Sequence, residues 1–367
     1  MEFADQNYSN LQRQEYNLEI VVGLQECGIR VEYKKDFISV IVAVRNEEQF
    51  ISSCIHALMC QKFPKDQYRI VIVDGMSDDK TRDIVKELMK IYPQNIILLE
   101  NPDRWQSAGR NLGIINERNS DYIAYIDGHC LADEDWLASL YDLMRECGGN
   151  IAGVGSVLAS PKDEVLIGKA IDLIFSTSLG GMGSSYRPQK QVKDVRTVPF
   201  VLYRRKALEE VNYYDEDLRY GEDYSLNYKL RAKGYKLLVN PKAIVYYYKR
   251  RSLLAFFKQM YNYGVTKAII AKRYPSSLSI VHVMPSLVLL FMVLIIIASL
   301  MLNRTLLVVP TFVLSAYVLV ILVTSGVHIV QRRAFRYLKY MPFLFILEHF
   351  GYSTGFLVGF IKKGWTQ

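Results

Sequence analysis

The sequence predicts an α/β fold, in which a mixed sheet is flanked by helices and is followed by a C-terminal transmembrane helical region. Short β-branched runs alternate with segments of helical period in the first two thirds of the chain, and polar residues follow those runs directly. From Leu278 on, long uncharged stretches replace the alternation. We therefore divide the 367 residues into an N-terminal extension (1–36), an α/β domain (37–248), an amphipathic membrane-interface segment (249–277) and a transmembrane region of two or three helices (278–367).

The strands of the α/β domain are predicted by four apolar runs, FISVIVAV, YRIVIVD, NIILLE and DYIAYID. Segments with a helical period separate these runs, at residues 46–61, 77–92 and 107–116. Strand and helix thus alternate, which is typical of an open sheet covered on both faces.

Polar side chains follow three of these strands. Asn46, Glu47 and Glu48 follow the first strand, Asp74, Ser77, Asp78 and Asp79 the second, and Asp127 and His129 the fourth. In open α/β sheets the ligand lies beyond the carboxyl ends of the strands. Any one of these residues could simply form a turn or a helix cap. Their recurrence after three strands favours a ligand-binding edge.

The charge and the cysteine content of the chain indicate what kind of partner it has and which redox environment it occupies. The net charge of +8 indicates an anionic partner, which could be nucleic acid, an anionic membrane surface or a phosphorylated small molecule. The five cysteines are odd in number and lack CxxC spacing, so we expect reduced thiols. The polar N-terminus lacks the apolar core of a signal peptide.

Two uncharged runs, 278–302 and 306–330, are long enough to cross a membrane as a helical hairpin. A third run, 340–361, carries Glu348 and His349 and several glycines, so it could cross, re-enter or lie flat. The loop QRRAFRYLK is rich in arginine, which predicts that it is cytoplasmic. We therefore expect a multi-pass protein of the cell (inner) membrane whose α/β domain faces the cytoplasm.

Five motifs occur in an order and spacing that resemble the nucleotide-sugar-binding core of family 2 glycosyltransferases. They are FISVIVAVRNEEQFISSCIHALMCQ, YRIVIVDGMSDDKTRDIV, SAGRNLGI, YIAYIDGHC and GEDYSLNYKLRAKGYKLL. Within the family, DGHC with SLGGMGSSYR and RRSLLAFFKQMYNYG is similar to bacterial enzymes of the succinoglycan type, which extend lipid-linked exopolysaccharide intermediates. The resemblance covers about Phe37 to Gly264 and implies a GT-A-type fold.

The resemblance also implies the donor site. Its nucleotide-binding residues would be Asn46, Glu47, Asp74, Asp79, Arg110 and Asp127. Asp74 would hold the nucleobase, while Asp79 would accept from it or support the loop. Asp127 and His129 occupy the ends of the family's Asp-x-Asp metal motif, and here a histidine replaces the second aspartate. Imidazole suits manganese better than magnesium, so Mn²⁺ is the preferred cofactor. The alternative for His129 is a hydrogen-bonded structural histidine.

The motif GEDYSLNYKLRAKGYKL places Glu222 and Asp223 at the start of an amphipathic helix. Asp223 matches the family's general base, which would take a proton from the acceptor hydroxyl, and Glu222 would support it. The alternative is that these acids only stabilise the helix N-terminus.

The acceptor half contains several basic residues. SLGGMGSSYR lacks the lysine and spacing of a P-loop, and Arg204 and Arg205 could bind a ligand or only begin a solvent-facing helix. The interface segment interleaves basic and large apolar side chains, so Arg250, Arg251 and Gln259 are candidates for holding a diphosphate beside the membrane. Gln259 is followed by Met260, Tyr261 and Asn262, so it does not begin the Gln-x-x-Arg-Trp motif of processive relatives. This departure puts processivity in doubt.

Together these features predict a membrane-bound, inverting, metal-dependent glycosyltransferase. It would move a sugar from a nucleotide diphosphate sugar, with UDP-glucose the first donor to test, to a polyprenyl-diphosphate-linked saccharide acceptor in exopolysaccharide or cell-surface glycan synthesis. The alternative is a non-catalytic membrane protein that keeps the sugar-nucleotide fold as a sensor or assembly platform. We expect no nucleic-acid partner, because the basic residues cluster beside the membrane spans and no recognition motif occurs.

Overall fold

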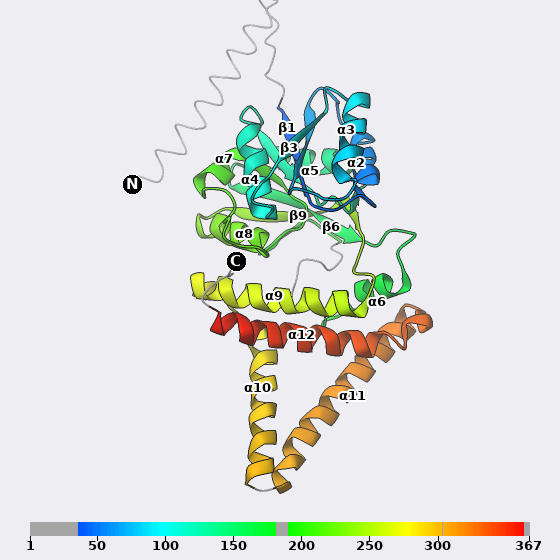
Figure 1. The fold of residues 1–367 in the computed structure, drawn as a ribbon, viewed down its shortest axis with the longest axis vertical. Helices are drawn as coiled ribbons and strands as arrows, with labels where there is room; N and C mark the ends of the chain where they lie inside the picture. Colours follow the sequence, from blue (N-terminus) through cyan, green and yellow to red (C-terminus); the bar gives the residue numbers. More distant parts are fainter. Residues whose placement is uncertain (1–35, 181–189, 303, 363–367) are drawn as a thin grey trace, which may run out of the picture. The chain divides into compact units, whose positions relative to one another are not determined.

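The computed structural model describes residues 36–180, 190–302 and 304–362. The predicted N-terminal extension therefore lies outside the described residues, apart from Asp36, as does most of SLGGMGSSYR. From Phe37 on, the chain belongs to one compact unit. Its centre is a nine-stranded sheet in the order β3-β2-β1-β4-β8-β6-β9-β5, with β7 paired to β9. Helices α2, α3 and α5 lie on one side of this sheet, and α4, α7 and α8 on the other (Figure 1).

The first half of the sheet is parallel and matches the predicted strands. Its elements are β1 (Ile38–Val44), α2 (Ile51–Met59), β2 (Tyr68–Asp74), α3 (Thr81–Ile91), β3 (Ile96–Glu100), α4 (Gln106–Asn116) and β4 (Tyr122–Tyr125). Strand β1 pairs in parallel with both β2 and β4. Its side chains are almost completely buried because helices cover both faces, which explains the continuous apolar run.

The second half of the sheet makes it mixed, as predicted. Its elements are β5 (Cys130–Ala132), α5 (Trp136–Glu146), β6 (Ile151–Ala159), α6 (Leu166–Phe175), β7 (Lys193–Asp194), β8 (Leu202–Arg204), α7 (Arg205–Glu210), α8 (Glu222–Ala232) and β9 (Lys236–Tyr247). Strand β8 is antiparallel to both β4 and β6, whereas β6 and β9 are parallel. The carboxyl end of β4 therefore lies at the centre of the sheet, between its two halves.

The C-terminal part is helical. It contains α9 (Leu253–Arg273), η1 (Pro275–Ser277), α10 (Ile280–Met301), η2 (Arg304–Leu307), α11 (Val308–Gln331), η3 (Phe335–Tyr337) and α12 (Met341–Ile361). Three segments are long and apolar enough to cross a membrane, judged by length and composition: α10, η2 with α11, and α12. The first two expose almost all of their apolar side chains, with 6% and 11% of each apolar window buried. Such exposed apolar surface requires lipid, so the chain is a membrane protein.

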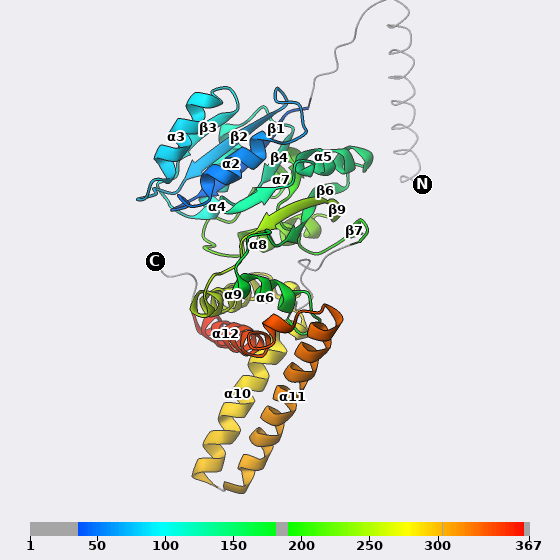
Figure 2. The ribbon, with the colours of Figure 1, turned by 90° about the vertical axis from the view of Figure 1, so that its right-hand side faces the viewer.

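Helix α12 differs from the other two apolar helices. Half of its apolar window is buried, and it runs beside α9 in both views, whereas α10 and α11 form a hairpin that points away (Figures 1 and 2). The pairing depends on glycine: a Cβ at Gly264 would overlap the carbonyl of Tyr352, and one at Gly355 would overlap the carbonyl of Tyr261. Residues 340–361 therefore form a helix that lies along α9, and α12 remains one of the three candidate membrane spans.

Candidate active site

The loops after β1 and β2 hold each other through polar contacts. The Asn46 backbone N–H donates to Ser77 Oγ over 2.9 Å, and the Asn46 side-chain oxygen accepts from the Asp78 N–H over 3.0 Å. Asn46 adopts a φ of 59°, which asparagine tolerates better than most residues. Asp74 is completely buried and accepts two bonds from Ser77, at 2.5 Å from the hydroxyl and 3.1 Å from the N–H. The predicted gathering of polar residues at this edge is therefore observed.

Asp79 supports the loop instead of pointing to a distant partner. Its carboxylate accepts from the Glu48 N–H over 3.1 Å and from the Thr81 N–H over 2.9 Å. Glu48 in turn accepts from the Lys80 N–H over 3.1 Å. Of the two roles considered for Asp79, these contacts favour support of the loop.

Glu47 lies beside the histidine of the DGHC motif. Its Oε1 is 2.8 Å from His129 Nδ1, so we infer that Nδ1 carries the proton. The other ring nitrogen, Nε2, is buried without a hydrogen-bond partner within the described part of the chain. Burial lowers the pKa of His129, but the hydrogen bond with Glu47 and the charge of Asp127 outweigh burial and raise the pKa. Glu47 thus orients the imidazole, which the sequence motif alone does not reveal.

Gly128 is needed for packing. A Cβ at this position would lie 2.7 Å from Val44 Cγ1 at the end of β1. Any larger residue would push the Asp127–His129 segment away from the sheet. This packing role is additional to the room that a glycine leaves for a phosphate.

A buried arginine joins the metal motif to the predicted base motif. The Arg110 guanidinium lies 3.2 Å from Asp127 Oδ1 and 2.7 Å from Glu222 Oε1, and only 4% of the residue is exposed. The Tyr125 ring lies 4.2 Å from the guanidinium carbon, close enough for a cation–π contact. Arg110 therefore bridges two carboxylates, and its contact with the donor stays a prediction.

Sequence reasoning missed Gln106. Its side-chain N–H donates to Asp127 Oδ1 over 2.7 Å. Gln106 and Arg110 are four residues apart in α4, so both lie on the same face of that helix. This spacing, directly before and within the SAGRN motif, is the signal that could have identified Gln106.

Asp127 and His129 are the candidate metal ligands, and the test is whether their free atoms fit a cation. Both described contacts of the Asp127 carboxylate fall on Oδ1, which leaves Oδ2 available, and His129 offers the buried Nε2. The described residues contain no group of three His, Cys, Asp or Glu side chains that could hold a metal. Two ligands fit a divalent cation that takes its remaining ligands from a diphosphate and water.

Glu222 and Asp223 begin α8 as predicted, after Gly221 with a φ of 73°. Burial raises the pKa of Glu222 to about 7, Arg110 opposes this rise, and the charge of Asp223 adds to it. Burial also raises the pKa of Asp223, whose Oδ1 accepts from the Tyr224 N–H over 2.8 Å. A carboxylate with a raised pKa is a stronger base than an exposed one, as proton abstraction from a hydroxyl requires.

The basic candidates of the interface segment occupy different surroundings. Arg250 is exposed, and its positive charge partly opposes the rise in the pKa of His129. Arg251 lies 5.4 Å from the Phe50 ring and 6.0 Å from the Tyr248 ring, while Gln259 donates to Tyr263 Oη over 3.1 Å. Of these three residues, Arg250 is thus the one with a described electrostatic interaction with His129.

Arg204 and Arg205 are structural. Arg204 donates to the Ile151 carbonyl over 3.0 Å and to the Met144 carbonyl over 2.7 Å. Arg205 donates to the carbonyls of Ser120 and Ile114, so neither residue only faces solvent. Of the two alternatives considered for this pair, these contacts argue against the solvent-facing one, because buried carbonyl groups at the ends of neighbouring elements require donors.

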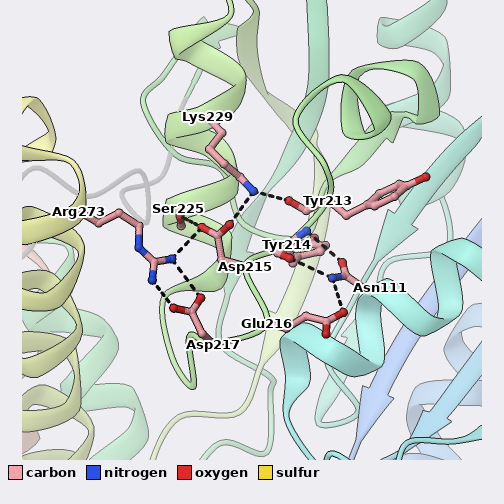
Figure 3. Close-up of polar contacts among 9 residues, drawn as sticks. All are labelled: Asn111, Tyr213, Tyr214, Asp215, Glu216, Asp217, Ser225, Lys229 and Arg273. Carbon is pink, nitrogen blue, oxygen red and sulfur yellow. Dashed lines mark hydrogen bonds and ion pairs between the residues drawn. The ribbon is translucent and has the colours of Figure 1, made fainter. Parts of the chain in front are cut away.

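The loop before α8 is held by a polar network that reaches α4 and α9 (Figure 3). Asn111 of α4 donates to the Tyr214 carbonyl over 2.9 Å and to Glu216 Oε1 over 2.8 Å. Asp215 accepts from Lys229 Nζ over 2.8 Å, and Arg273, the last residue of α9, pairs with Asp217. The network therefore connects the predicted base helix both to the donor-side helix α4 and to α9.

The sheet, the acid-lined carboxyl edge and the DGHC and EDY segments together define a sugar transferase with a GT-A-type fold. Residues 39–211 match the family model described as glycosyl transferase family 2. A Methanococcus voltae relative, named dolichyl N-acetyl-alpha-D-glucosaminyl phosphate 3-beta-D-2,3-diacetamido-2,3-dideoxy-beta-D-glucuronosyltransferase, is 31% identical over 332 residues, which is 89% of this chain and 98% of the relative. The chain belongs to glycosyltransferase family 2 and is a glycosyltransferase.

Further similarities agree with this assignment. The succinoglycan biosynthesis protein ExoA of Rhizobium meliloti is 29% identical over 62% of this chain and 68% of its own length, in line with the predicted resemblance to the succinoglycan type. The solved mannosyltransferase PcManGT of Pyrobaculum calidifontis, in complex with GDP-Man and Mn²⁺, superposes with a TM-score of 0.55 at 18% identity, and the alignment covers 88% of this chain and 89% of that one. This likeness shows a shared fold.

Proposed function

We propose that the protein is a membrane-bound, inverting glycosyltransferase that moves a sugar from a nucleotide diphosphate sugar to a lipid-linked saccharide acceptor in cell-surface glycan synthesis. The bridge from Asp127 through Arg110 to Glu222 carries this proposal, because Arg110 contacts one residue of the predicted metal motif and one residue of the predicted base motif. The name of the Methanococcus relative describes a lipid-phosphate-linked acceptor, which supports an acceptor of this class. UDP-glucose remains the first donor to test.

In the proposed reaction, Asp223 takes the proton of the acceptor hydroxyl as that oxygen forms a bond to the anomeric carbon. The bond from the anomeric carbon to the diphosphate oxygen breaks on the opposite face, so its electron pair leaves with the nucleoside diphosphate and the configuration inverts. Arg110 keeps Asp127 and Glu222 in place, and Gln106 fixes the orientation of Asp127. A divalent cation held by Asp127 and His129, preferably Mn²⁺, would offset the charge on the leaving diphosphate.

The membrane arrangement is part of the same proposal. We keep the division at residues 36, 248 and 277, with 37–248 as the catalytic domain. The arginine-rich loop after α11 contains Arg332, Arg333 and Arg336, which favours a cytoplasmic position for it and for the catalytic domain. A reporter fused to this loop should therefore report the cytoplasm, and a signal from the other side would reverse the orientation.

The experiment that tests the function uses the purified full chain in detergent against a panel of nucleotide sugars, with and without Mn²⁺. Transfer to a polyprenyl-linked saccharide is expected for at least one donor. Asp223→Asn should lower transfer by about 10²- to 10⁴-fold while donor affinity stays near normal. Asp83→Asn, an exposed acid in the first turn of α3, is the matched control and should leave transfer unchanged.

The outcomes separate the alternatives. Donor binding without hydrolysis or transfer by any tested pair would favour the non-catalytic sensor or assembly platform. Full transfer by Asp223→Asn would remove both the base assignment and the single-displacement mechanism. Loss of donor binding in that variant would instead make Asp223 a donor-site or structural residue.

A further inference from the structure

A buried lysine lies beside the proposed base, on the side where the membrane helices begin. Lys267 of α9 is 7% exposed, and its Nζ lies 3.7 Å from the centre of the Tyr224 ring and 3.3 Å from the Ser277 carbonyl oxygen. The Tyr224 hydroxyl donates to the same carbonyl over 3.0 Å. Tyr224 directly follows Asp223, so Lys267 contacts the residue next to the proposed base.

No carboxylate compensates Lys267 among the residues that the structure describes. Burial lowers its pKa to about 7, and repulsion from Arg196, which is exposed, contributes to the decrease. His282, near the start of α10, is within electrostatic reach of both cations. Burying a cation without an anion is unfavourable, and gathering further basic groups around it adds repulsion. An anionic ligand would remove both costs.

Three buried hydroxyl groups of residues in the same region also lack partners within the described residues. They are Thr266 Oγ1, Ser277 Oγ and Tyr352 Oη. Thr266 adjoins Lys267 in the chain, Ser277 supplies the carbonyl that Lys267 contacts, and Tyr352 is within electrostatic reach of Tyr224. Buried hydroxyl groups are normally hydrogen-bonded, and all three could donate to an oxygen-rich anion.

The position of this group of residues limits the source of the anion. Ser277 ends η1, and α10 begins three residues later at Ile280 with a capping interaction between Ser279 and His282. The start of a membrane span is the level at which lipid headgroups lie. A phosphate on a lipid is therefore the anion that this site would meet.

We propose that Lys267 and Arg196 bind the phosphate of the lipid-linked acceptor, with the surrounding hydroxyl groups as additional donors. The inference rests on the proposed function and assigns the acceptor phosphate to a place separate from Arg250, which lies near His129 on the donor side. Phosphate oxygens accept bonds from ammonium, guanidinium and hydroxyl groups, so the donor set matches this ligand. Anchoring the phosphate here would hold the acceptor saccharide next to Asp223.

The test measures binding without requiring turnover. Farnesyl phosphate and farnesol serve as probes for the full chain in phosphatidylcholine nanodiscs. The parent protein should bind farnesyl phosphate at least about 10-fold more tightly than farnesol, because only the phosphate pairs with the cations. Lys267→Met and Arg196→Gln should each lose most of this preference, whereas Lys267→Arg should retain it. Lys258→Met, which removes an exposed lysine from the same helix, is the matched control.

Each outcome decides the proposal. Equal binding of both probes by the parent protein, or an unchanged preference in both Lys267→Met and Arg196→Gln, would overturn it. The exposed Arg196 variant decides the matter where Lys267→Met fails to fold. Complete suppression of probe binding by phosphatidylglycerol in the nanodiscs would assign the site to bulk anionic lipid instead of the acceptor. A preference for farnesyl phosphate in a protein without transferase activity would support this site even though the proposed function had failed.

Discussion

The donor-side edge of the sheet and the membrane-facing part of the protein are built in different ways. At the donor edge, the partners that join the loops after β1 and β2 are about thirty residues apart: 31 positions separate Asn46 from Ser77, and 34 separate Glu47 from Thr81. In the membrane-facing part, 87 positions separate Lys272 of α9 from Gly359 of α12. These two loops of the donor edge are thus joined within successive strand–loop–helix units. The membrane-facing part depends on contacts that form only when distant segments meet.

Arg110 joins these two parts, and its loss should have the largest effect. Arg110→Met would leave the buried Glu222 and the partly buried Asp127 without their cation, and removing one partner of a buried ion pair typically costs about 3–5 kcal/mol of unfolding free energy. Arg110 opposes the burial-driven rise in the pKa of Glu222 and Asp223, so its removal should raise both values. Because the base must be deprotonated, the acid limb of the transfer rate should then move to higher pH.

The measurements are denaturant unfolding and a pH profile of transfer. Arg231→Met is the control, since Arg231 pairs with Asp194 over 2.6 Å but is partly exposed, and such a pair contributes only about 0.2–1 kcal/mol. A loss of stability in Arg110→Met no larger than that of the control would show that Arg110 does not hold the two parts together.

The same contrast explains what could be predicted from the sequence. The four parallel strands and their helices were predicted because buried strands and amphipathic helices leave local patterns. Asp127, His129 and Asp223 could be named because they belong to short motifs. Gln106 was missed, and Lys267 could be counted only among the basic side chains of the interface segment, since the contacts of both depend on partners from other elements. The close packing at the glycines where α9 contacts α12 could not be predicted either, because it depends on partners from the other helix.

Those glycines offer a way to break the membrane-facing part alone. Gly355→Val would force a side chain into the Tyr261 backbone, and overpacking of this kind costs on the order of 3 kcal/mol. We expect transfer to a lipid-linked acceptor to fall steeply. Donor affinity should stay within about twofold of the parent, which corresponds to about 0.4 kcal/mol of binding free energy. Gly326→Val in α11, where a Cβ meets no atom within 4 Å, should change neither quantity. An equal loss of donor affinity would mean that the two parts are not independent.

Changes at the metal motif should act on the donor side alone. His129→Ala removes one proposed ligand and Glu47→Gln weakens the hydrogen bond that orients it, so each should weaken Mn²⁺ activation by about 10- to 100-fold. Titration of Mn²⁺ in the presence of UDP, followed by calorimetry, measures this directly. His56→Ala, an exposed histidine of α2, is the control. Unchanged metal dependence in His129→Ala would return this histidine to a structural role.

The smallest effect is expected at Arg273, where α9 meets the loop before the base helix. Its partner Asp217 is 63% exposed in its side chain, and exposed ion pairs contribute about 0.2–1 kcal/mol. Lys229, which contacts Asp215 in the same loop, is mostly buried, so Lys229→Met should cost more, about 1.5–3 kcal/mol for a hydrogen bond to a charged group.

The pH dependence of this difference follows from the pKa of Asp215. Burial would raise the pKa of Asp215, but Lys229, Ser225 and Arg273 hold it below the ordinary value. Stability from a lowered carboxyl pKa is present above the unfolded value and is lost as the pH falls through the folded one. The difference in unfolding free energy between Lys229→Met and the parent should therefore shrink on acidification, and the smaller difference for Arg273→Met should shrink with it. A difference for Arg273→Met that equals that of Lys229→Met at neutral pH would show that the contact with α9 holds the loop as firmly as the buried lysine does.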